Sequence, residues 1–265
     1  MKESELMKAI EVKIDEMWNN YNFTGFSTES IQFFEDYPQT NNRDEEWDWW
    51  RTKSGTEKDG DYWTMLKPEF TDLLSDIAET IHSFDSGIEM KIEDNLGEPI
   101  NRRGPLPHCW GAIHTKNRDK RIDVQFFINL AGVGMRVGIF IGSHDKSPKS
   151  WNRYYTGLFE NKSLVFEELK KLEYLGYKFI STNHGHYIRK SEGEIISPES
   201  PDAMLDFAYS NQEFDVLKII DNSKLNSKEL IKEILTSFVE TRRIYEMLQL
   251  SNYSPKSRNL ILVDD

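Results

Sequence analysis

The sequence predicts an α+β fold, with a central antiparallel sheet of about four to six strands flanked by helices. Three observations support this fold class: helical apolar spacing near the N-terminus, alternating apolar residues in the middle of the chain, and helical spacing again beyond residue 200. The connections between the middle segments are short, which favours antiparallel neighbours. We expect residues 1–195 to form the α+β domain and residues 196–265 to form a helical C-terminal segment or subdomain.

Two helices are expected in the first hundred residues. Residues 3–20 carry apolar side chains at helical spacing, and residues 61–83 carry a second apolar face. Pro68 lies within the second stretch, and proline favours the first turn of a helix, so a start just before Pro68 is the alternative. The segment between them is acidic, aromatic and irregular, with loops expected at "PQTNN" and "KSGTEKDGD".

Strands are expected from about residue 86 to residue 142. The segments "GIEMKIE", "HCWGAIHT", "RIDVQFFINLA" and "GMRVGIFIG" carry the strand pattern, while "NLGEPINRRGPLP" is typical of a loop. In the third of these segments one face is apolar: Ile122, Val124, Phe126, Ile128, Leu130. The other face is mostly polar: Arg121, Asp123, Gln125, Phe127, Asn129.

The remaining elements follow in order. A helix is expected at about 162–174, with Gly176 as its C-terminal cap. The segment "YKFISTNHGHYIRK" predicts a hairpin that turns near His184 and Gly185. Residues 201–221 have the spacing of two short helices, and residues 227–249 that of a longer one.

Composition and charge limit the class of protein. Hydrophobic residues make up 38% of the chain and aromatic residues 12%, which indicates a packed core. A single cysteine excludes an internal disulfide, and no apolar run approaches the roughly 20 residues that span a bilayer. We therefore expect a cytoplasmic protein without membrane contact.

The formal net charge of −12 is unevenly distributed. Residues 1–100 carry a net charge of −15, residues 101–190 carry +9, and residues 191–265 carry −6. A basic middle third could bind an anionic partner. Alternatively, the basic and acidic parts neutralise one another in the fold.

The stretch "HCWGAIH" contains reactive residue types, but its geometry argues against a catalytic or metal site. In a strand His108 and His114 lie roughly 20 Å apart, and Cys109 points to the opposite face. The chain has no zinc-binding motif, no phosphate-binding glycine loop and no nucleophile elbow. We expect no cofactor, no metal ion and no catalytic residue. The alternative is a metal-dependent hydrolase or nuclease that uses Asp123 and His114 with His184 or His186.

Basic and aromatic residues of the middle third predict a binding surface for nucleic acid or another polyanion. Cations meet phosphates and aromatic rings stack on bases. The expected cations are Arg102, Arg103, Lys116, Arg118, Lys120, Arg121 and Arg136, and the expected stacking residues are Trp110 and Trp151.

The segment "RDEEWDWWRTK" supports an alternative of a different class. Trp47, Trp49 and Trp50 stand among four acidic residues, and tryptophan is enriched where proteins bind partners. They could anchor a protein partner, form a cage for a cationic group, or close a core. The first of these possibilities predicts an interaction or inhibitor protein acting through its acidic N-terminal half.

Residues 121–142, "RIDVQFFINLAGVGMRVGIFIG", resemble small α+β modules attached to bacterial restriction and phage-defence proteins, including the modules in front of McrB-type restriction GTPases. The resemblance covers one strand pair and extends to the preceding "WGAIH". It implies a recognition module of a defence or counter-defence system, without catalysis of its own. No active-site residue of such systems matches a position in this chain.

Overall fold

The computed structural model describes residues 3–37, 42–54, 61–97, 100–101, 104–106, 108–118, 120, 123–142, 148–181, 194–211 and 213–249. Helices and antiparallel sheets make up this part of the chain, so the α+β prediction is confirmed. None of the helices in these ranges combines the length and apolar character that a membrane crossing requires.

The helices lie mostly before and after the central strands. They are α1 (Glu3–Met17), α2 (Thr28–Glu35), α3 (Arg43–Ser54), α4 (Asp61–His82), α5 (Ile92–Asn95), α6 (Pro148–Glu160), α7 (Lys162–Tyr174), α8 (Pro201–Asn211), the 3-10 turn η1 (Asn222–Lys224) and α9 (Leu230–Gln249).

The main sheet has six strands in the order β3-β4-β5-β8-β6-β7, and every neighbouring pair is antiparallel. The strands are β3 (His108–Ile113), β4 (Gln125–Ala131), β5 (Gly134–Gly142), β6 (Lys178–Ser181), β7 (Glu194–Ile196) and β8 (Glu213–Ile220). Two shorter strands, β1 (Ile100–Asn101) and β2 (Gly104–Pro105), pair with each other.

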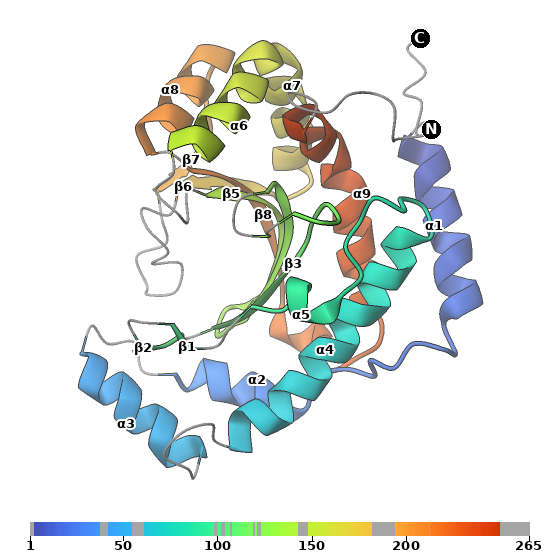
Figure 1. The fold of residues 1–265 in the computed structure, drawn as a ribbon, viewed down its shortest axis with the longest axis vertical. Coiled ribbons are helices and arrows are strands. Elements are labelled where there is room, and N and C mark those ends of the chain that lie inside the picture. The colour runs from blue at the N-terminus through green and yellow to red at the C-terminus, as the bar shows by residue number, and fades with distance from the viewer. Residues whose placement is uncertain are drawn as a thin grey trace.

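The sheet is strongly curved, and its convex face carries the main core (Figure 1). The ring of Phe126 on β4 packs edge-on against Phe238 of α9, with centroids 5.3 Å apart. Gly111 of β3 lies against Leu74 of α4, because a side chain there would meet Leu74 at 2.4 Å. Helices α4 and α9 therefore bury the apolar face that the alternation of residues 122–130 predicts.

The opposite face of the same strands is concave, and we call it the concave face. In Figure 1 the labelled helices lie on the convex side or beyond the ends of the strands, with α6, α7 and α8 at one end and α2 and α3 at the other. Strand alternation places these described side chains on the concave face: His108, Trp110, Gln125, Phe127, Asn129, Arg136, Phe140, Asp215 and Leu217.

Several helices and strands follow the sequence prediction. Helix α7 has the predicted bounds, and α1, α4 and α9 match the predicted helices to within a few residues. Strands β3, β4 and β5 form the predicted antiparallel series. Strand β6 lies in the segment predicted to form a hairpin, but its partner β7 lies beyond residue 190, where that segment ends. The turn predicted at His184 and Gly185 lies outside the described residues.

Two predicted elements are wrong. The segment "GIEMKIE" contributes only an isolated bridge between Ile88 and Thr115 before α5 begins. Residues 213–220, expected to be helical, form β8 between β5 and β6. The boundary predicted at residue 195 therefore falls inside the sheet, because β7 and β8 extend it beyond that point. Helices α2, α3, α5 and α6 were not predicted.

Candidate functional site

Three adjacent strands place three different polar groups in one row on the concave face. Asn129 of β4 is the register partner of Trp110 on β3 and of Arg136 on β5. Side chains paired in this way have Cβ atoms about 5 Å apart. An indole, a carboxamide and a guanidinium therefore stand side by side across the middle of the sheet.

The amide of Asn129 is buried without a hydrogen bond. Its side chain is 1% exposed, and neither its oxygen nor its nitrogen has a partner. A polar group left in this state destabilises the fold by about 1–3 kcal/mol, so such groups are uncommon without a functional reason. Two neighbours on the same face share this condition, at Nδ1 of His108 and Oε1 of Gln125. The concave face therefore holds a cluster of unused hydrogen-bonding groups.

Arg136 gives this cluster its charge, and His108 lies on the same face. Both are buried, with exposures of 8% and 9%. Burial, with the charge of Arg136 as the second cause, lowers the pKa of His108 to about 3. The imidazole is consequently neutral at neutral pH, and the guanidinium supplies the positive charge at this end of the face.

The other end of the concave face has acceptor groups. Gln125 donates from Nε2 to the carbonyl of Lys120, which leaves its Oε1 directed to the face. Asp215 of β8 is the register partner of Phe140 and is 1% exposed. Phe127 lies between the two ends on β4, and its ring is 5.8 Å from that of Phe140 at the acceptor end. The face therefore runs from a cationic end through aromatic rings to an end with oxygen acceptors.

The predicted nucleic-acid-binding residues do not form one open basic surface in the described part of the chain. Arg118 forms an ion pair with Asp123 at 3.1 Å, and Lys120 donates from Nζ to the carbonyl of Leu96. Lys116 is exposed, while Arg136 is buried on the concave face. Four further predicted residues lie outside the described side chains: Arg102, Arg103, Arg121 and Trp151.

Trp110 belongs to the concave face but is packed on one side. A Cβ atom built on Gly97 would lie 2.3 Å from the indole, so the ring rests directly on that glycine. The ammonium of Lys120 lies 5.7 Å from the ring centroid. Trp110 therefore lines the row beside Asn129 and is not open on both faces for stacking.

The groups of the alternative hydrolase site are engaged in local hydrogen bonds. Asp123 accepts from the backbone N–H of Thr115 at 3.1 Å as well as from Arg118. The ring nitrogens of His114 lie 3.1 Å from the carbonyl oxygen of Thr115 and 3.3 Å from that of Asp94. Within the described ranges no three His, Cys, Asp or Glu side chains are grouped to hold a metal ion. His184 and His186 lie outside those ranges.

Cys109 faces the convex core. It is 1% exposed, and burial raises the pKa of its thiol well above the usual range. A protonated thiol enclosed by apolar side chains is a poor nucleophile, as strand geometry predicts.

The three tryptophans of the predicted partner-binding segment lie on α3 and contribute to packing. Trp50 is 2% exposed and meets Phe33 of α2 edge-on at 5.6 Å. Trp49 contacts the same ring at 6.3 Å, and Trp47 lies under the guanidinium of Arg51. This arrangement attaches α3 to α2, which corresponds to the core-closing alternative.

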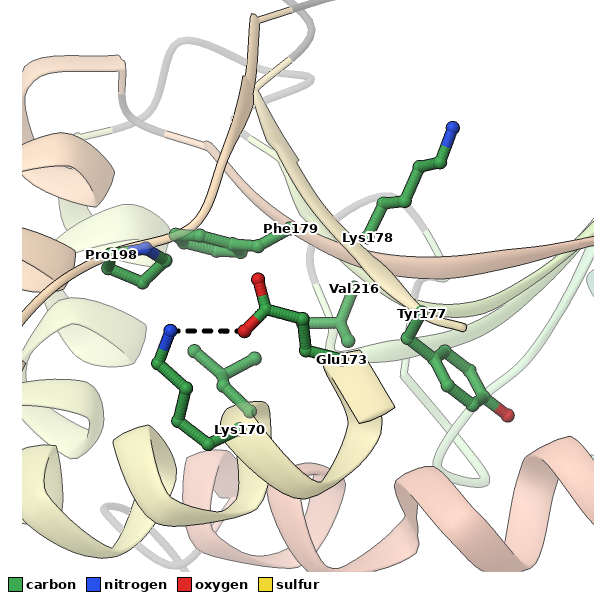
Figure 2. Close-up of a pocket in the computed structure, with 8 residues that line it drawn as sticks. Lys170, Glu173, Tyr177, Lys178, Phe179, Pro198 and Val216 are labelled. Atoms are coloured by element: carbon green, nitrogen blue, oxygen red, sulfur yellow. Dashed lines mark hydrogen bonds and ion pairs between the residues drawn. The ribbon is translucent and has the colours of Figure 1, made fainter. Parts of the chain in front are cut away.

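A separate small pocket lies between α7 and β6 (Figure 2). Its volume is about 10 Å³, which is room for a single water. Lys170 and Glu173 form an ion pair of 3.0 Å across one side of it. The size of this pocket excludes an organic ligand.

Comparison with known proteins adds no family to this assignment. The chain matches no protein-family model, and it matches no curated protein. The candidate site therefore depends on its own geometry. Sequence reasoning selected Trp110 and Arg136 but missed Asn129, Gln125 and His108 as binding residues. The sequence signal that could have identified Gln125 and Asn129 is their alternation with apolar neighbours, which places both on the same face of the strand.

Proposed function

We propose that this protein is a non-enzymatic recognition protein that binds an anionic ligand on its concave face. The observation that supports this most directly is the buried and unpartnered amide of Asn129, held beside the guanidinium of Arg136. An anion placed at Arg136 would gain charge-assisted hydrogen bonds, and its neighbouring atoms would satisfy Asn129.

The basic middle third agrees with this proposal, because it favours approach of an anion from solution. The arrangement of Arg118 and Lys120 argues against a broad polyphosphate surface, since both cations are engaged locally. The ligand is therefore expected to reach the face itself. A role in a prokaryotic defence system stays a prediction from the resemblance of residues 121–142.

Thermal melting in the presence of anionic probes tests the proposal. Inorganic phosphate, pyrophosphate and short single-stranded DNA would each be titrated against the purified protein at low salt. A ligand that binds only the folded state raises the melting temperature, and added salt should reduce the effect. We expect at least one probe to do so.

Two variants locate the effect. Arg136→Met should abolish the stabilisation by the probe, whereas Lys116→Met removes the same charge from an exposed position and should leave it unchanged. Circular dichroism would establish that Arg136→Met folds. A native protein unaffected by all three probes at low salt would overturn the proposal, as would an Arg136→Met protein that responds like the native one.

A further inference from the structure

An open groove runs along one side of α1. Its volume is about 470 Å³, and Ala9 and Val12 of α1 line it together with Phe84 from the turn after α4. Val12 is 58% exposed, and Phe84 is half-buried. The stripe that attaches α1 to the core consists of other residues: Leu6, Ile10 and Ile14. Helix α1 therefore presents a second apolar stripe at the surface.

Charged side chains mark the two ends of this groove. Lys8 lies one helical turn before Val12, and Glu16 lies one turn after it. Glu16 is paired with Lys13 at 3.3 Å, whereas Lys8 forms no ion pair with the described residues. Eight residues of helix rise about 12 Å. A segment that fits this groove therefore has an apolar run of that length and a negative charge at the Lys8 end.

Residues 250–265 lie outside the described residues, and their sequence carries the complementary pattern. The apolar run "LILV" at 260–263 is preceded by Lys256 and Arg258 and followed by Asp264 and Asp265. Four extended residues span about 13 Å, which is close to the length of the groove. The order of basic, apolar and acidic residues in this segment thus matches the groove read from its Glu16 end to its Lys8 end.

Helix α9 ends close to the groove. Gln249, its last residue, donates from Nε2 to Oγ1 of Thr115 at 2.9 Å. Thr115 forms a bridge with Ile88, which follows Phe84 by four residues. In Figure 1 the last turn of α9 and the first turn of α1 lie toward the same end of the molecule. Residues 250–257 span up to about 27 Å when extended, and α1 is only about 22 Å long. The chain beyond α9 therefore reaches any point along the groove.

We propose that residues 259–265, "NLILVDD", bind in this groove of the same chain. Their apolar run covers Val12 and Phe84, and Asp264 and Asp265 face Lys8. This proposal is independent of ligand binding on the concave face. It also defines the chemistry of a partner protein that would displace the segment, namely an apolar run followed by acidic residues.

A dye-labelled peptide with the sequence of residues 255–265 tests the proposal. Fluorescence anisotropy would measure its binding to the full chain and to a chain that ends at residue 254. We expect the shortened chain to bind the peptide about tenfold or more tightly than the full chain does. The reason is that a tethered segment competes at an effective concentration in the millimolar range. Circular dichroism would establish that the shortened chain folds.

Variants of the shortened chain locate the binding site. Val12→Asp should weaken peptide binding about tenfold or more, because it places a charge against the apolar run. Val133→Asp is the matched control, since Val133 is 54% exposed in the turn between β4 and β5, and it should leave binding unchanged. Lys8→Glu should weaken binding several-fold. A peptide with Asp264→Lys and Asp265→Lys should restore it.

Three results would overturn the proposal. Equal binding to the full and shortened chains would show that the segment does not occupy the groove, which would then be open to a partner protein. Absence of binding to both chains would show that the segment does not fit. A loss with Val133→Asp as large as that with Val12→Asp would exclude this groove as the site.

Amide hydrogen exchange of the full chain is a second measurement that needs no shortened chain. The amides of residues 260–263 should exchange more slowly in the native protein than in Val12→Asp, because binding in the groove protects them. Val133→Asp should exchange like the native protein. Equal exchange rates in the native protein and Val12→Asp would also overturn the proposal.

Discussion

His108 and Arg136 lie on the same face of the sheet, and the guanidinium adds to burial in holding the pKa of the imidazole at about 3. The unfolded chain has no such constraint, so there the imidazole titrates near its ordinary pKa of about 6.5. Between about pH 3 and pH 6.5, His108 therefore binds a proton in the unfolded state but not in the native state.

The sign of the resulting pH dependence follows from this difference in proton binding. The contribution of His108 is fully present above about pH 6.5 and is lost as the pH falls toward 3. Between pH 7 and pH 5 the loss is about 2 kcal/mol. Urea unfolding of the native protein and of His108→Gln at both pH values measures it. His108→Gln should lose less free energy of unfolding than the native protein between pH 7 and pH 5. Equal losses in the two proteins would contradict the lowered pKa of His108.

Asn129→Leu should stabilise the protein while abolishing ligand binding. Leucine has a similar shape and removes two buried polar atoms that lack partners, so we expect a gain of about 1–3 kcal/mol in the free energy of unfolding. Thermal or urea unfolding checks the gain.

Asn95→Leu is the matched control for this substitution. Asn95 is also fully buried, but its amide nitrogen donates to the carbonyl of Glu89 at 3.0 Å, so its replacement should destabilise the fold. Destabilisation by Asn129→Leu of similar size would mean that Asn129 has a structural role.

Arg118→Ala should destabilise the fold by about 1–3 kcal/mol, because it removes an ion pair to the buried carboxylate of Asp123. A double-mutant cycle with Asp123→Asn measures the coupling between the two side chains. Lys116→Ala removes a nearby exposed cation and should stay within about 0.5 kcal/mol of the native stability. A coupling energy near zero would show that the ion pair with Asp123 does not stabilise the fold.

Trp50→Ala should destabilise the protein by about 3–5 kcal/mol, since the indole is 2% exposed between α3 and α2. Trp47→Ala removes a partly exposed ring that packs at the edge of the core and should have a smaller effect. Chemical unfolding of both variants tests the order. If Trp50→Ala retained native stability, the core-closing role of this segment would be excluded and the partner-binding alternative would gain support.

The sequence predicts those helices and strands that have one apolar face packed on the core and one polar face. Helices α1, α4 and α7 have one apolar stripe, and residues 122–130 have apolar and polar faces, so their periodicity is clear. Strand β8 lies between two other strands and has buried residues on both faces. Its apolar residues, including Leu217 and Ile220, therefore also fit a helical spacing.

The candidate site was only partly predictable for a related reason. A polar strand face in a sequence is normally a solvated face, and Gln125 and Asn129 have that pattern. Both side chains are 1% exposed in the fold, and no local pattern encodes this burial. Trp110 and Arg136 were selected for their chemistry, and the sheet then placed them beside Asn129.

The position of β8 also has a consequence for synthesis on the ribosome. Strand β5 gains its second neighbour only when residues 213–220 have emerged, more than seventy residues after β5 itself. Until then one long, largely apolar edge of the nascent sheet has no partner, and such edges favour aggregation. A chain shortened before β8 should therefore be recovered mainly in the insoluble fraction, because the emergence of residues 213–220 determines whether the sheet can close.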